Sequence, residues 1–355
     1  MGHLAIVNSD TIVGIKDNHP YISIGGTLNS LPYKTISDLF ADALAVRDGD
    51  IIFTWMIDGG ASPGVGFDRY FIANGSVLFD SADPAYPIKI GVKDGYKYDN
   101  AVPEEIALDL FCPHLLWNAI GKKSLGRGRS LSHQTLDEDE QLFTLLSRAN
   151  DGRFPHQVIS IPVYNNTFKR ITINNFGANI NAQIGRGSPM NNIFVNGIIW
   201  NTGNQFLYEK TLEAFLCENI DSNAISFCRL LGYPNYRIKW FGNYLPYGVA
   251  GKNIDFVCEL EGDAESIIVV IELKKTRESY NGYRQIIDGQ LNAYTQFIGD
   301  AFRSYRGNNF GMEQVVLTHI PGRRLAPGLS QHNYTKWVGY DIDPASNRAI
   351  FTRLL

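Results

Sequence analysis

Residues 251–275, GKNIDFVCELEGDAESIIVVIELKK, are typical of two β-strands joined by a short acidic turn. Side chains alternate along a strand, and both faces of the second strand stay apolar until Glu272. A strand that is apolar on both faces is expected at the buried centre of a sheet. Asp255 begins the first strand, so a hairpin would bring its carboxylate near Glu272 and near Lys274.

Two carboxylates and an ammonium at the rim of a buried sheet suit phosphodiester chemistry. Mg²⁺ takes oxygen ligands and keeps several waters, so Asp255 and Glu272 would be enough to hold it beside a phosphate. We expect Mn²⁺ to substitute for it. Lys274 would orient the attacking water or stabilise the pentacovalent state. The triplet Glu-Leu-Lys alone is also typical of a strand that ends in a surface salt bridge.

The order Asp255, Glu272, Lys274 resembles the motif of the PD-(D/E)xK nuclease superfamily. Residues 204–298 are similar to its archaeal mismatch and branched-DNA endonucleases, through the segments YEKTLEAFLCENI, NIDFVCEL, IIVVIELKK and GQLNAYTQF. The resemblance implies a restriction-endonuclease-like domain over residues 204–355, an α/β fold with a central mixed sheet flanked by helices. The chain departs from the family in the long aromatic interval before Asp255.

Two helices of this domain are expected to complete the site. Residues 204–220 form an amphipathic helix with Glu209 and Glu213 one turn apart, and in the family an acidic residue of the first helix joins the metal site. Either glutamate fits, and a solvated helix face is the alternative. In the helix at 283–302, Gln290 and Tyr294 resemble the family's QxxxY element, whose glutamine faces the active site. The alternative is a surface glutamine.

The N-terminal part reads as short strands with a few helices. A helix is predicted for 35–46, with strands at 51–55, 67–72, 76–79 and 88–92 and helices at 105–117 and 135–150. The segment NDGRFP at 150–155 is a turn-rich break and marks the domain boundary. Residues 151–203 contain short stretches in which apolar and polar residues alternate, and they are predicted to form a β-rich connecting segment.

Residues 30–150 resemble the PUA-like superfamily, in particular its EVE and YTH-type modules. The likeness rests on GDIIFTW, YPIKIGV and LFCPHLLWNAIGKKSLGRGRSLSHQTLDEDEQLFTLL. It implies an α+β domain built on a small β-barrel that reads nucleic acid, in several members by enclosing a modified base in an aromatic cage. By this resemblance the cage residues are Trp55, Tyr70 and Trp117, and the backbone contacts are Lys123, Arg127 and Arg129. The alternative is that the aromatic residues form the core.

The composition bears on the number of domains, on membrane insertion and on the cellular compartment. A length of 355 residues suggests two domains, and 44% hydrophobic residues are enough for a sizeable core. No apolar run approaches the roughly 18 residues of a membrane span. The N-terminus lacks the basic start of a signal peptide, and four widely spaced cysteines indicate a reducing cytoplasm.

The charges are distributed unevenly between the halves. Residues 1–150 hold 12 basic and 19 acidic residues, while residues 151–355 hold 20 and 17. A phosphate-binding surface must therefore be local.

Together these features predict a Mg²⁺-dependent DNA endonuclease. Pairing a reader of modified bases with such a nuclease favours a restriction enzyme that cuts modified, for example methylated, double-stranded DNA. We expect a homodimer, because one site per chain cuts one strand. The alternatives are a repair nuclease for mismatched or branched DNA, a conventional enzyme that reads an unmodified palindrome, and a non-catalytic protein that binds nucleic acid.

Overall fold

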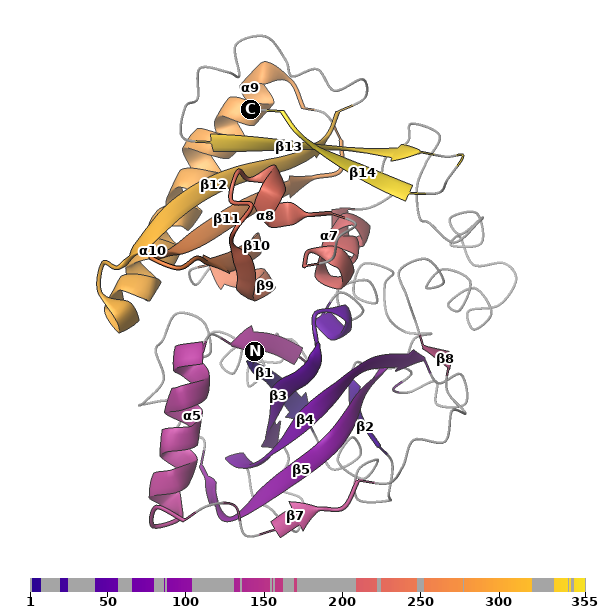
Figure 1. Cartoon of the computed structure of the whole chain (residues 1–355). Helices are drawn as coiled ribbons and strands as arrows, with labels where there is room; N and C mark the ends of the chain where they lie inside the picture. The colour runs from indigo at the N-terminus through magenta and orange to yellow at the C-terminus, as the bar shows by residue number, and fades with distance from the viewer. Residues whose placement is uncertain are drawn as a thin grey trace. The chain divides into compact units, whose positions relative to one another are not determined.

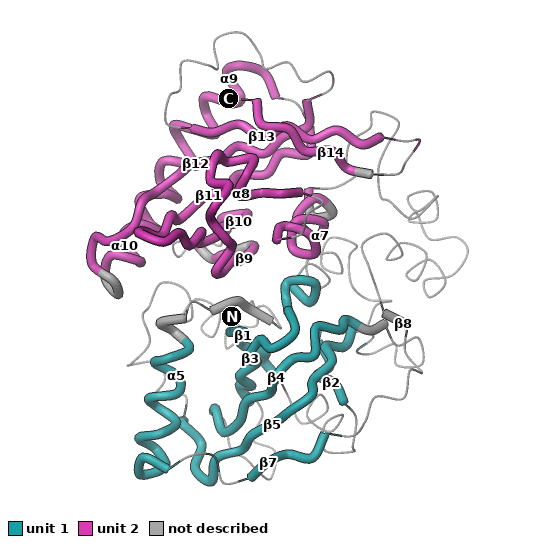
Figure 2. The backbone as a smooth tube through the Cα atoms, in the orientation of Figure 1, with its two compact units in different colours: residues 1–172, 179–188 teal, residues 173–178, 189–355 magenta. Residues whose placement is uncertain are grey.

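The computed structural model describes two separate compact units of the chain. It describes residues 2–7, 20–24, 42–56, 66–79, 86, 88–103, 131–134, 136–153, 155, 157–161, 169–170, 209–221, 225–247, 252–276, 278–320, 335–343, 345 and 348–354. The first unit comprises residues 1–172 and 179–188, and the second comprises residues 173–178 and 189–355 (Figure 2). Both units combine a sheet with helices, which confirms the expected mixed α and β composition.

The first unit is built on a curled sheet of eight strands. They are β1 (Gly2–Val7), β2 (Tyr21–Ile24), β3 (Asp48–Met56), β4 (Gly66–Phe79), β5 (Ile88–Val102), β6 (Leu131–Gln134), β7 (Gln157–Ile159) and β8 (Lys169–Arg170). The main path is β2-β5-β4-β3-β1-β6, while β7 pairs with β5 and β8 with β4 (Figure 1). The predicted helix at 135–150 is present as α5 (Leu136–Ala149).

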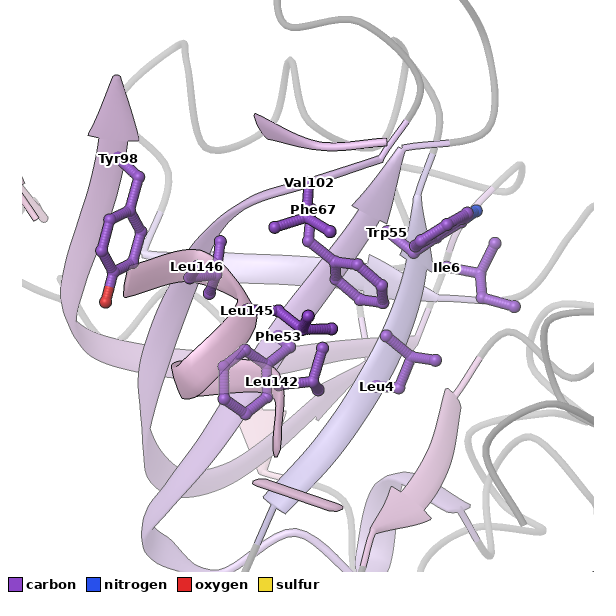
Figure 3. Close-up of a cluster of buried hydrophobic side chains, with 10 residues drawn as sticks. All are labelled: Leu4, Ile6, Phe53, Trp55, Phe67, Tyr98, Val102, Leu142, Leu145 and Leu146. Atoms are coloured by element: carbon purple, nitrogen blue, oxygen red, sulfur yellow. The ribbon is translucent and has the colours of Figure 1, made fainter. Parts of the chain in front are cut away.

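The core of the first unit lies between this sheet and α5. Its buried residues come from β1, β3, β4, β5 and one face of the helix: Leu4, Ile6, Phe53, Trp55, Phe67, Tyr98, Val102, Leu142, Leu145 and Leu146 (Figure 3). The leucines of α5 recur at helical spacing, which explains why this segment forms an amphipathic helix.

Four strand pairings in this unit were not anticipated from the sequence. Strand β1 lies inside the sheet, parallel to β3 on one side and antiparallel to β6 on the other. Strands β7 and β8 fall within the predicted connecting segment at 151–203, and both pair with strands of the first sheet. The predicted helix at 105–117 and most of the helix at 35–46 lie outside the described residues.

The second unit is built on a mixed sheet of six strands in the order β14-β13-β12-β11-β10-β9. Their bounds are β9 (Arg237–Tyr247), β10 (Lys252–Glu261), β11 (Ser266–Lys274), β12 (Phe310–His319), β13 (Thr335–Asp343) and β14 (Arg348–Arg353). Strands β10 and β11 form the predicted antiparallel hairpin. Strands β11, β12 and β13 are parallel to one another, and β11 is buried from Ile267 to Leu273.

Helices cover both faces of this sheet. Phe215 of α7 (Glu209–Asn219) stacks on Phe351 of β14, the register partner of Tyr340. Tyr283 of α9 (Tyr280–Gln285) packs edge to face on Trp337, three residues before Tyr340 on β13. An odd separation along a strand puts side chains on opposite faces, so α7 and α9 lie on opposite sides. A short helix, α8 (Phe227–Leu230), precedes β9.

The helix predicted at 283–302 is longer and contains a π-turn. It runs through α9, η3 (Ile286–Leu291) and α10 (Asn292–Arg306), and the N–H of Asn292 donates to the carbonyl of Ile287, five residues earlier. The wider turn rotates the side chains that follow relative to an α-helix. None of the helices in the described part of the chain is long and apolar enough to cross a membrane.

A buried hydrogen bond joins β1 to β3 in the first unit. Nε2 of His3 lies 2.8 Å from Oδ2 of Asp50, which also accepts the backbone N–H of Arg47 at 2.8 Å. Burial raises the pKa of Asp50, but the hydrogen bond and charge of His3 and the Arg47 N–H outweigh burial, so the pKa lies below its ordinary value. The charged carboxylate therefore stabilises the folded state.

We predict that Asp50→Asn lowers the free energy of unfolding at pH 7 by about 1–3 kcal/mol. Because the folded-state pKa is lowered, the stabilisation is present above the unfolded-state pKa and is lost as pH falls through the folded-state pKa. The difference between variant and wild type should therefore shrink by pH 3 in urea unfolding. Asp48→Asn, which removes the exposed partner of Lys93, is the control and should change stability little. An equal Asp50→Asn effect at both pH values would contradict the prediction.

Candidate active site of the second unit

The hairpin of β10 and β11 places Asp255 beside Glu272. Phe256 is the register partner of Ile271, so the preceding residue of β10 lies opposite the following residue of β11. The backbone N–H of Leu273 donates to Oδ2 of Asp255 at 2.9 Å, which fixes the carboxylate against β11. Glu272, Val316 and Trp337 are successive register partners, so this pair lies on the face that α9 covers.

The two carboxyl groups share a hydrogen bond. This hydrogen bond by itself lowers the pKa of Glu272. Burial, and next the charge of Glu272, raise the pKa of Asp255 well above its ordinary value. Burial also raises the pKa of Glu272, although Lys274 opposes that effect. Such a pair of like charges is unfavourable in the folded protein and is typical of functional sites.

Lys274 brings a positive charge to the pair. Its Nζ donates to Oε1 of Glu272 at 2.7 Å and to the carbonyl of Leu273 at 2.9 Å. Burial lowers the pKa of Lys274, but Glu272, Asp255 and Glu209 outweigh burial and raise it above its ordinary value. The side chain is therefore an ammonium at neutral pH.

Of the two glutamates in α7, Glu209 joins this cluster. Its Oε2 lies 3.7 Å from Nζ of Lys274, and its charge raises the pKa of Asp255 and Glu272. Glu213 is buried and accepts a hydrogen bond from Nδ2 of Asn243 at 2.6 Å. Asn243 is the register partner of Phe256 and so lies on the opposite face of the sheet from Asp255.

Tyr294 lies near the carboxylates, and Tyr247 packs against it. Tyr294 of α10 is buried, and its pKa is raised by burial and then by the charges of Glu272 and Asp255. Tyr247 of β9 packs edge to face on Tyr294 with ring centroids 4.9 Å apart. The sequence singled out Tyr294 within its motif. Tyr247 was not anticipated, because its position depends on the strand pairing of β9.

Gln290 lies in the π-turn and is exposed. It makes no hydrogen bond to the described part of the chain. The wider π-turn explains its exposure, because a π-turn has more residues per turn than an α-helix and rotates Gln290 away from the buried side chains of Ile287 and Leu291. Its predicted role in catalysis stays a prediction.

The residues predicted to bind a base are placed differently from one another. Trp55 is 2% exposed and packs edge to face on Phe67, so it belongs to the core of the first unit. Tyr70 is half-buried and stacks on Tyr96 with ring centroids 5.0 Å apart. The other predicted base-binding residues lie outside the described residues. They are the aromatic Trp117 and the three backbone contacts Lys123, Arg127 and Arg129.

The donor set of the cluster fits a hard divalent cation. Two adjacent carboxylates, that of Glu272 buried and that of Asp255 half-buried, repel each other, and Glu209 adds a third negative charge to one ammonium. Within the described residues, no three His, Cys, Asp or Glu side chains form a group that could hold a metal ion by themselves. Two carboxylates suffice for Mg²⁺, which keeps waters and substrate oxygens as its other ligands. Asp255 and Glu272 are thus the residues that would hold it.

Comparison with family models, with curated proteins and with solved structures finds no match to this chain. The possible activity of the cluster is therefore inferred from its residue types and their contacts. Adjacent carboxylates can bind a divalent cation, and a buried ammonium can stabilise negative charge that develops on a substrate.

We predict that Asp255→Asn stabilises the second unit when divalent ions are chelated. The raised pKa means that the charged carboxylate is disfavoured by folding, so its cost grows as pH rises from the unfolded-state pKa through the folded-state pKa. The gain in unfolding free energy should be at least about 1 kcal/mol at pH 9 and should vanish near pH 4. Urea unfolding across this range measures it.

Glu259→Gln is the matched control on the same strand. Glu259 is buried, and its Oε1 lies 3.3 Å from Nζ of Lys239, so removing its charge leaves that ammonium without this partner. We expect Glu259→Gln to lower the unfolding free energy by about 1–3 kcal/mol. If Asp255→Asn lowered the unfolding free energy as much as Glu259→Gln does, the charge of Asp255 would not be unfavourable in the folded protein, and the prediction would be wrong.

Proposed function

We propose that this chain is a Mg²⁺-dependent DNA endonuclease that hydrolyses phosphodiester bonds. The observation that carries the proposal is the cluster of Asp255, Glu272 and Lys274 at the end of a buried central strand, with Glu209 beside it. These residue types in this order are also those of the PD-(D/E)xK motif that the sequence resembles. The mixed sheet covered by helices on both faces is consistent with that superfamily.

The residues of the cluster have separable roles. Asp255 and Glu272 would hold Mg²⁺, which when bound neutralises phosphate charge and lowers the pKa of a coordinated water. Glu209 adds negative charge and contacts Lys274. Lys274 carries a positive charge beside these carboxylates, and as a hydrogen-bond donor it would orient the attacking water and stabilise the pentacovalent phosphorus.

The first unit supplies the recognition part of the proposal. Its resemblance to PUA-like modules, which are small β-barrels, supports a nucleic-acid reader and, joined to a nuclease, a restriction enzyme for modified DNA. Tyr70, half-buried in its stack with Tyr96, is the described aromatic residue that best fits contact with a base. Cutting both strands of a duplex with one site per chain calls for a homodimer.

We predict that wild type cleaves plasmid DNA in Mg²⁺ or Mn²⁺ and not in EDTA. Lys274→Ala and Glu272→Gln should each lower the cleavage rate by at least about 10²-fold, because each removes a charge that acts on the scissile phosphate. Gel assays of nicked and linear products measure the rates.

The two glutamates of α7 provide an internal control for this prediction. Glu209→Gln should slow cleavage by about 10-fold or more, since its carboxylate acts on Lys274. Glu213→Gln keeps an acceptor for Asn243 and should cut at close to the wild-type rate. Full activity of Lys274→Ala would refute the proposed site. Binding of DNA without any cleavage by wild type would instead indicate a non-catalytic protein.

We predict preferential cleavage of methylated over unmodified plasmid of the same sequence. The ratio of the two cleavage rates should exceed about 10, the discrimination given by one good base contact of 1–3 kcal/mol. Equal rates would remove the dependence on modification and leave the nuclease proposal standing. Faster cleavage of mismatched or flapped duplexes than of homoduplex would then favour the repair alternative.

A further inference from the structure

Three buried hydroxyl groups bind the short loop that follows Lys274. They belong to Thr318 of β12, Tyr283 of α9 and Tyr340 of β13, whose side chains are 0%, 1% and 1% exposed. The structure describes Lys275, Thr276, Glu278 and Ser279 of this loop, which leads from the end of β11 to the first residue of α9. It therefore begins at the residue directly after the lysine of the proposed active site.

Each hydroxyl contacts the backbone of this loop. Oη of Tyr340 donates to the carbonyl of Lys275 at 2.6 Å. Oγ1 of Thr318 donates to the carbonyl of Thr276 at 3.0 Å. This uses the single proton of Thr318, so Oη of Tyr283, 3.0 Å away, donates to Thr318. Tyr283 in turn accepts the N–H of Glu278 at 3.0 Å.

The loop is held from both faces of the sheet. Thr318 is the register partner of Lys274, so both side chains lie on the face that carries Asp255 and Glu272. Tyr340 is the register partner of His319 and so lies on the other face. Successive carbonyls, those of Lys275 and Thr276, are thus held on opposite sides, which restricts rotation of the chain at the end of β11.

Packing alone does not account for these three residue types. A buried hydroxyl costs free energy unless it is hydrogen-bonded, and valine or phenylalanine would fill the same volume. All three hydroxyls nevertheless bind within four residues of Lys274. Lysine has a flexible four-carbon stem, so the position of its ammonium depends on how firmly its backbone is held.

We propose that Thr318, Tyr283 and Tyr340 are positioning residues that hold Lys274 for catalysis. The inference rests on the proposed nuclease function, because it assigns these hydroxyls a role in the same site. In the hydrogen bonds described above, they bind the loop and one another rather than the carboxylates. Removing these hydroxyls frees the backbone after Lys274, which displaces the ammonium from Glu272 and slows the chemical step. DNA binding depends on other surfaces and stays unchanged.

The test uses Thr318→Val and Tyr340→Phe in the full chain. The single-turnover rate of plasmid cleavage in Mg²⁺ at saturating protein should fall by about 10–100-fold, as misplacement of a catalytic group by about 1 Å does. The protein concentration that gives half the maximal rate should change less than about threefold. Amide hydrogen exchange of residues 274–278 should accelerate, and that of the strands β10 and β12 should not.

Matched controls remove the same groups at the other end of the sheet. Tyr233→Phe deletes a hydroxyl that donates to Glu313, and Thr335→Val deletes one that donates to Oε1 of Gln314 at 3.3 Å. Both controls should cleave at the wild-type rate even if their melting temperatures fall. Thr318→Ser retains the hydroxyl and should restore most of the rate that Thr318→Val loses.

Three results would overturn the proposal. They are an unchanged single-turnover rate in both test variants, a loss of rate matched by the control variants, and weaker DNA binding as the whole effect. If Thr318→Val does not fold, Tyr340→Phe decides by itself. If wild type does not cleave DNA, the nuclease function fails, and hydrogen exchange of residues 274–278 still decides whether the hydroxyls hold the loop.

Discussion

The second unit depends on one contact, the pairing of β10 with β11 that places the carboxyl of Asp255 against that of Glu272. Water is excluded on both faces of β11, so the repulsion between these groups is weakly screened. The neighbouring ammonium of Lys274 offsets part of this repulsion. The apolar strands around the cluster supply the stability that such an unfavourable group requires, and a bound cation would relieve the same repulsion.

Much of this arrangement could be predicted from the sequence. The apolar run within residues 266–274 and the acidic turn before it predict a hairpin. Because side chains point to alternate faces of a strand, the hairpin then determines which side chains are neighbours. The choice between Glu209 and Glu213 could not be made in this way. Both lie on one edge of the helix, and what separates them is the side chain of Asn243, brought in by a strand whose register the sequence does not fix.

Two other features were beyond sequence reasoning for different physical reasons. Gln290 was placed on the apolar stripe by counting 3.6 residues per turn, and the π-turn at Ile286–Leu291 changes that count locally. Trp55 was predicted to line a base-binding cage, and it packs on Phe67 in the core. An aromatic residue on a strand has the same sequence pattern in either case, because which face of the sheet α5 covers is decided by tertiary packing.

The position of β1 has a consequence for how the first unit is made. Gly2–Val7 leaves the ribosome well before its antiparallel neighbour β6, which begins at Leu131. The backbone groups on both edges of β1 can be hydrogen-bonded only after more than a hundred further residues have been translated. Pairing strands that are so far apart in the sequence slows folding. Until then a strand buried along its whole length presents open backbone groups, and during synthesis this segment is where we expect chaperones to bind the nascent chain.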